Sequence, residues 1–258
     1  MTLDRWVPFR NEGAVVRCRL FSFPHAAGSA AYYRRLRSSM PAEFDFCPVE
    51  LPGRGARLDE PPFVSMSALM TQLSHVLQPL MGVPFAFLGH SVGACMAFEA
   101  ARQLRSADDR PAVHLFVSGR GSPSCAPADP AAARLRSDHD LLAVLARFGG
   151  TPTAIVQRPE LMAVLLPALR ADLALAEGYA VDPGDRIACP ITAFGGADDV
   201  SSGSLQSWSA FTRGAFRSSI FPGGHFYFAP EAQALANEII RDLNASLDVH
   251  AAGARSWL

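Results

Sequence analysis

The 258-residue sequence contains no lysine, and all 23 of its basic residues are arginine. Enzymes that form a lysine Schiff base are therefore excluded, as are proteins that need the lysine of a Walker phosphate-binding loop. An excess of charge is also missing, because 24 acidic residues leave a formal net charge of −1 at pH 7. This balance favours neither nucleic acid nor an anionic membrane surface as a partner.

Cysteine is scarce and dispersed, and long apolar runs are absent. The five cysteines include no CxxC pair, and histidine and cysteine do not cluster as metal ligands do. The amino-terminal residues are charged and polar where a signal peptide is apolar, and no run reaches the roughly 18 apolar residues of a membrane span. We therefore expect a cytoplasmic protein with reduced thiols, no metal and no cofactor.

The chain does have enough apolar material for a large core, since 49% of its residues are hydrophobic. Six short runs rich in β-branched and aromatic residues predict strands, and candidate helices lie at 29–40, 65–81, 92–105, 205–212 and 230–247. This alternation predicts one doubly wound α/β domain over residues 1–258, with a mostly parallel sheet and helices on both faces. The strand runs are VVRCRLFSF, FDFCPVEL, FAFLGH, VHLFVSG, ITAFGG and FRSSIFPGG.

The alternation stops between residue 121 and about residue 185. A proline-rich stretch, GSPSCAPADP, precedes two apolar helical patterns, SDHDLLAVLARFGG and PELMAVLLPALRADLALAEGY. Pro167 inside the second pattern is expected to kink or divide that helix. We interpret the region as a helical lid inserted into the domain, with ordinary core packing as the alternative. The last residues, VHAAGARSWL, are expected to form a loose tail.

The stretch FLGHSVGACMAFEAARQL carries the pattern G-x-S-x-G between an apolar strand and a helix. In a nucleophile elbow, small residues such as Gly89 and Gly93 let the strand and helix approach closely, while the serine projects from a strained turn. A plain strand-to-helix turn is the alternative. The flanking strand and helix favour Ser91 as a nucleophile.

A serine hydroxyl needs a base to take its proton, and His225 is the best candidate among the seven histidines. It lies in FPGGHFYF, a glycine-flanked loop after the last predicted strand, where open α/β folds gather their sites. The order of serine before histidine also fits hydrolases with this elbow. His25, in the FPHAAG loop, is expected to line the site, but it precedes the serine. The other histidines, including His90, are assigned packing or surface positions.

The third catalytic group should be an acid at the end of the preceding strand, where it would orient the imidazole. ITAFGGADDVSS supplies two adjacent aspartates there. The usual spacing of this fold selects Asp199 when it is counted from Gly196, and Asp198 when it is counted from Gly195. The other aspartate of the pair would then cap the following helix.

Acyl transfer also needs donors for the oxyanion that forms on the substrate. The backbone N–H of Val92, directly after the serine, is one such donor by construction. We assign Ala26 as the second, because the loop FPHAAGSAAYY follows the early strand and its small residues allow the backbone to approach a substrate. A tight strand-to-helix link is the alternative explanation for those small residues.

Together these blocks resemble the stand-alone type II thioesterases that accompany modular polyketide synthases and non-ribosomal peptide synthetases. The similarity covers nearly the whole chain in the family's order, with two small departures: Val92 replaces a common methionine, and Ala27 replaces a usual glycine. The doubled aspartate, without the proline that often follows, leaves the choice between Asp198 and Asp199 open. The blocks are FPHAAGSAAYY, VELPGRGARLDEPP, FLGHSVGACMAFEAARQL, ITAFGGADDVSS followed by LQSWSAFT, and FPGGHFYF.

The resemblance implies an α/β-hydrolase fold and hydrolysis of aberrant or stalled acyl groups from the phosphopantetheine arm of an acyl or peptidyl carrier protein. It implies Ser91 as nucleophile, His225 as base and Asp199 as orienting acid, with Ala26 and Val92 as oxyanion donors. A carboxylesterase or lipase that uses the same triad is the alternative enzyme. A catalytically idle scaffold that binds carrier protein is the alternative from another class.

Overall fold

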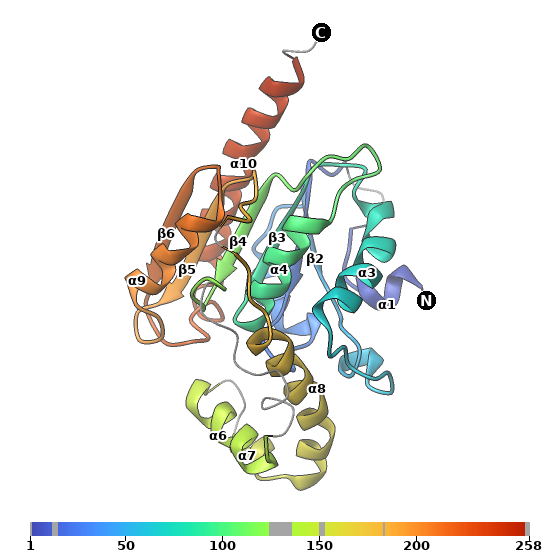
Figure 1. Ribbon diagram of the computed structural model, residues 1–258, viewed down its shortest axis with the longest axis vertical. Helices are drawn as coiled ribbons and strands as arrows, with labels where there is room; N and C mark the ends of the chain where they lie inside the picture. The colour runs from blue at the N-terminus through green and yellow to red at the C-terminus, as the bar shows by residue number, and fades with distance from the viewer. Residues whose placement is uncertain (1, 12–14, 124–135, 150–152, 183, 256–258) are drawn as a thin grey trace.

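The computed structural model describes residues 2–11, 15–123, 136–149, 153–182 and 184–255. A six-stranded sheet in the order β2-β1-β3-β4-β5-β6 forms its centre, and every neighbouring pair of strands is parallel (Figure 1). All six predicted strands are present, and the expected α/β fold is confirmed. The strands are β1 Cys18–Phe23, β2 Phe44–Pro48, β3 Phe85–His90, β4 His114–Ser118, β5 Ile191–Gly196 and β6 Phe216–Phe221.

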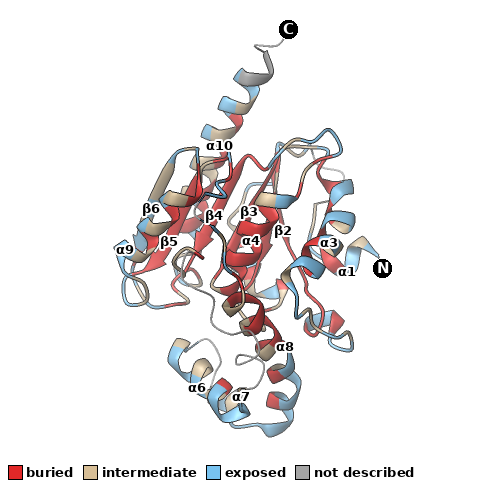
Figure 2. Ribbon diagram, viewed as in Figure 1, coloured by how far each residue is buried: buried red, intermediate tan, exposed pale blue. Residues whose placement is uncertain are grey.

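Alternate residues along the strands fill two separate cores, one on each face of the sheet. Phe21 and Phe87 belong to the core that α3 and α4 cover, whereas Leu20 and Leu88 belong to the core beneath α2 and α10. This separation follows from the two-residue period of a strand, which points successive side chains to opposite faces. In Figure 2, β2 to β5 and α4 are buried, whereas β6 at the edge of the sheet and the outer faces of α3 and α10 are partly exposed. The covering helices are α2 Arg34–Ser38, α3 Met66–Leu77, α4 Val92–Gln103 and α10 Ala232–Arg255.

Three of the predicted helices are divided into shorter pieces. The helix predicted over 65–81 ends at Leu77, and a 3₁₀ helix with a proline in its first turn follows it. In the other two, a buried aromatic side chain lies at the break. Within 29–40, a 3₁₀ turn precedes α2, and the buried Tyr33 hydroxyl donates a hydrogen bond to the Phe23 carbonyl (2.8 Å). Within 205–212, the buried Trp208 indole donates to the Arg120 carbonyl (2.9 Å). Tertiary packing overrides the helical pattern at both places. The remaining short elements are α1 Leu3–Trp6, η1 Ala30–Tyr33, η2 Gly55–Arg57, η3 Gln78–Leu80, α9 Ser202–Gln206 and η4 Ser207–Phe211.

Among the residues described between β4 and β5, three helices lie below the sheet in Figure 1: α6 Asp138–Phe148, α7 Thr153–Val156 and α8 Pro159–Glu177. Ser137 begins α6 with a reciprocal capping box to Asp140. Pro167 lies inside α8 without dividing it, and its neighbours Leu166 and Leu169 are buried. Most of the proline-rich stretch before α6 lies outside the described residues.

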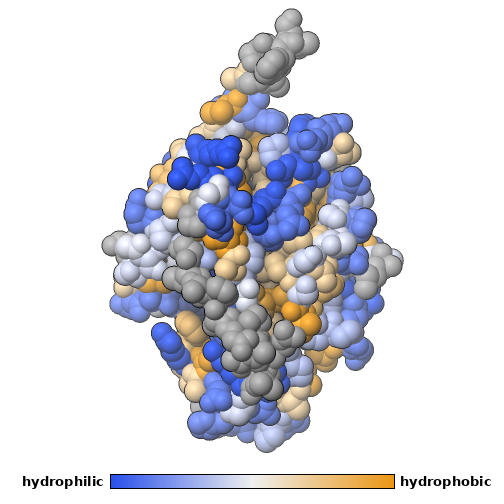
Figure 3. Space-filling model, in the orientation of Figure 1, coloured by the Kyte–Doolittle hydropathy of each residue, from blue (hydrophilic) through white to orange (hydrophobic). Residues whose placement is uncertain are grey.

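The expectation of a loose carboxyl-terminal tail is wrong, because α10 continues to Arg255 and projects beyond the sheet (Figure 1). The alanines of this segment are the best helix formers, which explains the extension. On the face drawn in Figure 3, hydrophilic residues surround smaller hydrophobic patches. Among the described residues, no helix is both long and apolar enough to span a membrane.

Candidate active site

The turn between β3 and α4 has the geometry of a nucleophile elbow. Ser91 occupies a strained backbone conformation, with φ 56° and ψ −118°, and its N–H donates to the Ser118 carbonyl (2.8 Å). A Cβ atom on Gly89 would lie 2.0 Å from the Gly93 carbonyl oxygen, and one on Gly93 would lie 2.1 Å from the Phe23 carbonyl oxygen. Both glycines are therefore required for the strand and helix to approach this closely.

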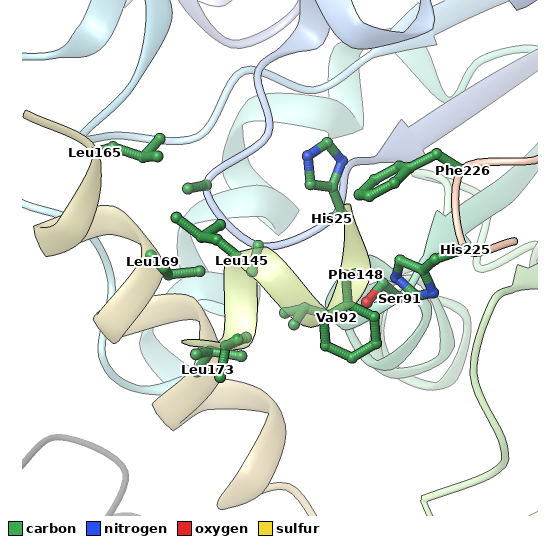
Figure 4. Close-up of a pocket in the computed structure, with 13 residues that line it drawn as sticks. His25, Ser91, Val92, Leu145, Phe148, Leu165, Leu169, Leu173, His225 and Phe226 are labelled. Atoms are coloured by element: carbon green, nitrogen blue, oxygen red, sulfur yellow. The ribbon is translucent and has the colours of Figure 1, made fainter. Parts of the chain in front are cut away.

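His225 and Ser91 come from distant loops and line one pocket (Figure 4). His225 follows β6 and is 7% exposed, and its Nδ1 lies 2.8 Å from the Asp199 Oδ2. Asp198 is exposed, and its backbone N–H donates to the Gly223 carbonyl (3.0 Å). The structure thus brings Ser91, His225 and Asp199 together and leaves Asp198 outside the group.

The two predicted oxyanion donors also line this pocket. Val92 is the first residue of α4, so its N–H has no acceptor within the helix. The N–H of Ala26 makes no hydrogen bond within the described part of the chain, whereas the next amide, that of Ala27, donates to the Asp172 Oδ2 (2.8 Å). The amides of Val92 and Ala26 therefore remain available to a substrate oxygen.

Apolar side chains of α6 and α8 form the rest of the pocket wall, and the cavity they enclose is small. The cavity measures about 70 Å³, and the Phe148 ring lies 4.5 Å from the His225 imidazole, measured between ring centroids. In Figure 4, Phe148 lies beside Ser91 and His225, and leucines of α8 line the other side. This wall fits a small apolar group better than a charged one. Its side chains are Val144, Leu145 and Phe148 from α6 and Leu165, Leu169 and Leu173 from α8.

Two further histidines lie near His225, and both are uncharged near neutral pH. The His25 ring packs between Tyr32 (4.3 Å) and Phe226 (5.0 Å), and burial lowers the pKa of His25 to about 3. His90 lies 4.8 Å from His225, and burial holds the pKa of His90 well below its usual value. Neither ring therefore carries a positive charge beside the Ser91 pocket near neutral pH.

The structure places His25 in the pocket, as the sequence predicted, and His90 beneath it. The Nδ1 of His90 lies 2.9 Å from the Ser118 Oγ, which lies 2.7 Å from the Tyr227 hydroxyl. Within the described residues, no group of three or more histidine, cysteine, aspartate or glutamate side chains could hold a metal ion.

The sequence patterns did not predict three residues near the site: Arg54, Phe148 and Asp172. Arg54 and Asp172 form a buried ion pair, with Nη1 and Nη2 lying 2.5 and 2.9 Å from the two carboxylate oxygens. The sequence offered two signals for this ion pair: Asp172 is an acid within an apolar helical pattern, and Arg54 lies between two glycines. Neither position identifies its partner, because 118 residues separate them.

Comparison with known proteins places these features in a family. The thioesterase domain model matches residues 18–247. The gramicidin S biosynthesis protein GrsT of Aneurinibacillus migulanus is 37% identical over 229 residues, covering 87% of this chain and 88% of the relative. The linear gramicidin dehydrogenase LgrE of Brevibacillus parabrevis is 34% identical over 237 residues, covering 90% of each chain.

Solved structures agree with this assignment. The type II thioesterase BorB from the borrelidin biosynthetic cluster superposes with a TM-score of 0.80 at 34% identity, covering 93% of this chain and 98% of its own. The RedJ thioesterase from the prodiginine pathway of Streptomyces coelicolor gives 0.78 at 33% identity, covering 88% and 86%. The resemblance drawn from the sequence blocks is confirmed. A matching domain model, relatives aligned over about nine-tenths of their length and a shared fold together establish that this chain belongs to the thioesterase family.

Proposed function

We propose that this protein hydrolyses acyl thioesters on the phosphopantetheine arm of an acyl or peptidyl carrier protein, and so removes aberrant or stalled groups during polyketide or non-ribosomal peptide biosynthesis. One observation carries the proposal: Ser91, on a strained elbow, shares a pocket with a histidine whose Nδ1 lies 2.8 Å from Asp199. Family membership and the pathways named for BorB and RedJ support the substrate class.

The reaction divides into two acyl transfers. The Ser91 hydroxyl attacks the thioester carbonyl while His225 takes its proton, and Asp199 stabilises the imidazolium that forms. The N–H groups of Ala26 and Val92 bind the oxyanion of the tetrahedral intermediate. His225 then protonates the leaving thiol, which leaves an acyl-enzyme on Ser91. A water molecule, deprotonated by His225, releases the acyl group as a carboxylate.

The helices α6 and α8 supply the other part of the proposed site. Their apolar side chains form the wall that the acyl group would contact, while the reactive groups come from loops at the carboxyl ends of the strands. Expulsion of water by an acyl group strengthens the hydrogen bonds to the oxyanion, because the local dielectric falls. We therefore assign α6–α8 the role of a lid over the site.

Carrier-bound substrates provide the test. Acetyl- and propionyl-loaded carrier proteins are incubated with the enzyme and followed by mass spectrometry, which reports the loss of the acyl mass. Ser91→Ala should abolish release, because it removes the nucleophile, while Ser67→Ala on the exposed face of α3 serves as the matched control. Undiminished release by Ser91→Ala would refute the proposal.

A comparison of substrates separates the alternatives. The same acyl group is supplied as a carrier thioester and as a simple oxygen ester, and kcat/KM is measured for each. A strong preference for the oxygen ester would instead identify a carboxylesterase. If Ser91 failed to react with a fluorophosphonate in the folded protein, the result would favour a binding scaffold.

A further inference from the structure

The buried carboxylate of Asp172 connects α8 to the loop after β1. It is 2% exposed, and it accepts two hydrogen bonds from the Arg54 guanidinium, at 2.5 and 2.9 Å. The same Oδ2 atom accepts the N–H of Ala27 at 2.8 Å, across 145 residues of sequence. A buried charge is tolerated only when it is paired in this way, so the arrangement fixes three segments of the chain against one another.

The Ala27 amide belongs to a tight turn whose conformation is unusual for alanine. The turn runs from His25 to Gly28, closed by a hydrogen bond from the Gly28 N–H to the His25 carbonyl (2.8 Å). Ala27, its third residue, has φ +58°, a value that favours glycine. An alanine there needs support from its surroundings, and the carboxylate of Asp172 supplies it.

Ala26 is the second residue of that turn, so its N–H belongs to the peptide immediately before the one that Asp172 binds. We propose that Asp172 is a positioning residue: by holding the Ala27 amide it directs the Ala26 N–H at the substrate oxyanion, and Arg54 holds the carboxylate in place. This inference rests on the proposed function, in which Ala26 is an oxyanion donor.

The position of Asp172 on α8 gives the arrangement a second consequence. Leu169 and Leu173 on the same helix line the pocket that would receive the acyl group. The helix that contacts the substrate therefore also orients a donor for the transition state. In this proposal, the contacts of α8 with α4 and with the loop after β1 also complete the oxyanion hole.

Removing the carboxylate alone would leave Arg54 as an unpaired buried charge, so both residues are changed together. Arg54→Gln with Asp172→Asn replaces the ion pair by an amide pair, and the asparagine oxygen can still accept the Ala27 N–H. Arg54→Gln with Asp172→Ala removes that acceptor. The two double variants carry the same net charge, and they differ in whether Ala27 has a partner.

Asp45 offers a matched control far from the pocket. This buried aspartate on β2 also pairs with an arginine, Arg19 (3.1 Å), and accepts a backbone N–H, that of Asn11 (2.8 Å). Arg19→Gln with Asp45→Ala therefore reproduces the loss of a buried ion pair and of an amide acceptor. We expect it to lower the melting temperature while kcat stays within about twofold of wild type, as expected for changes that leave the transition state untouched.

The expected result is a selective loss of kcat. Arg54→Gln with Asp172→Ala should lower kcat on an acyl thioester by about 10- to 100-fold with KM little changed, less than complete removal of a donor. Asp172→Asn in the same Arg54→Gln background should recover at least about tenfold of that loss. Equal kcat values for these two double variants, or an equal loss in the Arg19→Gln, Asp45→Ala control, would overturn the proposal.

A second variant and a second readout keep the test decisive. If the Ala variant does not fold, Arg54→Met with Asp172→Leu restores apolar packing without an acceptor, and it should show the same loss of kcat. The rate at which a fluorophosphonate labels Ser91 should fall in parallel, because the phosphonyl oxygen occupies the oxyanion site. Labelling uses no thioester, so the labelling rates of the variants can be compared even if the enzyme does not hydrolyse carrier-bound thioesters. Labelling rates equal to that of wild type would contradict the role of Asp172.

Discussion

The adjacent aspartates after β5 provide the sharpest test of the site, because two matched substitutions have opposite predicted outcomes. In Asp199→Asn, the new amide would donate to the Nδ1 of His225, at the position where the Asp199 Oδ2 now lies 2.8 Å away. The imidazole would then carry its proton on Nε2 and could not accept one from Ser91. If the amide oxygen faced Nδ1 instead, the imidazolium would lose its stabilising negative charge.

Either orientation should lower kcat by about 10⁴-fold, the loss known for this substitution in a serine protease triad, or roughly 5.5 kcal/mol at 1.36 kcal/mol for each factor of ten. Asp198→Asn keeps the backbone N–H that bonds to Gly223, and it alters only an exposed side chain. Its kcat should stay within about twofold of wild type, as for most surface substitutions.

The assay is steady-state hydrolysis of an acyl thioester, with the released thiol measured colorimetrically. Melting temperatures of both variants confirm that each remains folded. Retention of more than about a tenth of wild-type kcat by Asp199→Asn would exclude Asp199 as the orienting acid, since the corresponding substitution in a serine protease triad costs about 10⁴-fold. Equal losses of activity in Asp198→Asn and Asp199→Asn would exclude it as well.

Two further predictions concern the pocket and the buried Glu50. Phe148→Ala enlarges a cavity of about 70 Å³ beside His225. The ratio of kcat/KM for an octanoyl thioester to kcat/KM for an acetyl thioester should therefore rise about tenfold or more. An unchanged ratio would show that Phe148 does not limit acyl size. Burial raises the pKa of Glu50 from 4.5 to about 7, so wild type should lose stability as the pH rises from about 4.5 through 7. Between pH 5 and 8, urea unfolding should show about 2.5 kcal/mol more loss for wild type than for Glu50→Gln, at 1.36 kcal/mol for each pKa unit. Equal losses would exclude this role for Glu50.

The sequence was sufficient to predict the sheet, because each strand lies in a short run rich in β-branched and aromatic residues, and most of these runs end at a glycine, proline or serine. It was also sufficient to nominate Ser91 and His225, because their loops combine special backbone geometry with reactive side chains. The choice between Asp198 and Asp199 depends on the direction of two side chains in one turn. Counting along the strand leaves that direction open, and the structure places only Asp199 against the imidazole.

The contacts that the sequence analysis missed are those that join distant segments. Asp172 and Ala27 each look ordinary in their local context, as a polar residue in a helix and a small residue in a loop. Their hydrogen bond depends on how α8 packs against the loop after β1. The broken helices at 29–40 and 205–212 have a similar origin, because Tyr33 and Trp208 are drawn into the core by contacts that local periodicity does not encode.

The separate origins of the pocket wall and the reactive groups have a consequence for how such enzymes diversify. The wall comes from α6 and α8, whereas Ser91, Asp199 and His225 follow β3, β5 and β6. Substitutions confined to these two helices can therefore change which acyl groups a duplicated enzyme prefers, while the proposed catalytic residues keep their positions. Position 172 is the exception, because a change there would alter both, and selection should hold it fixed while the leucines around it drift.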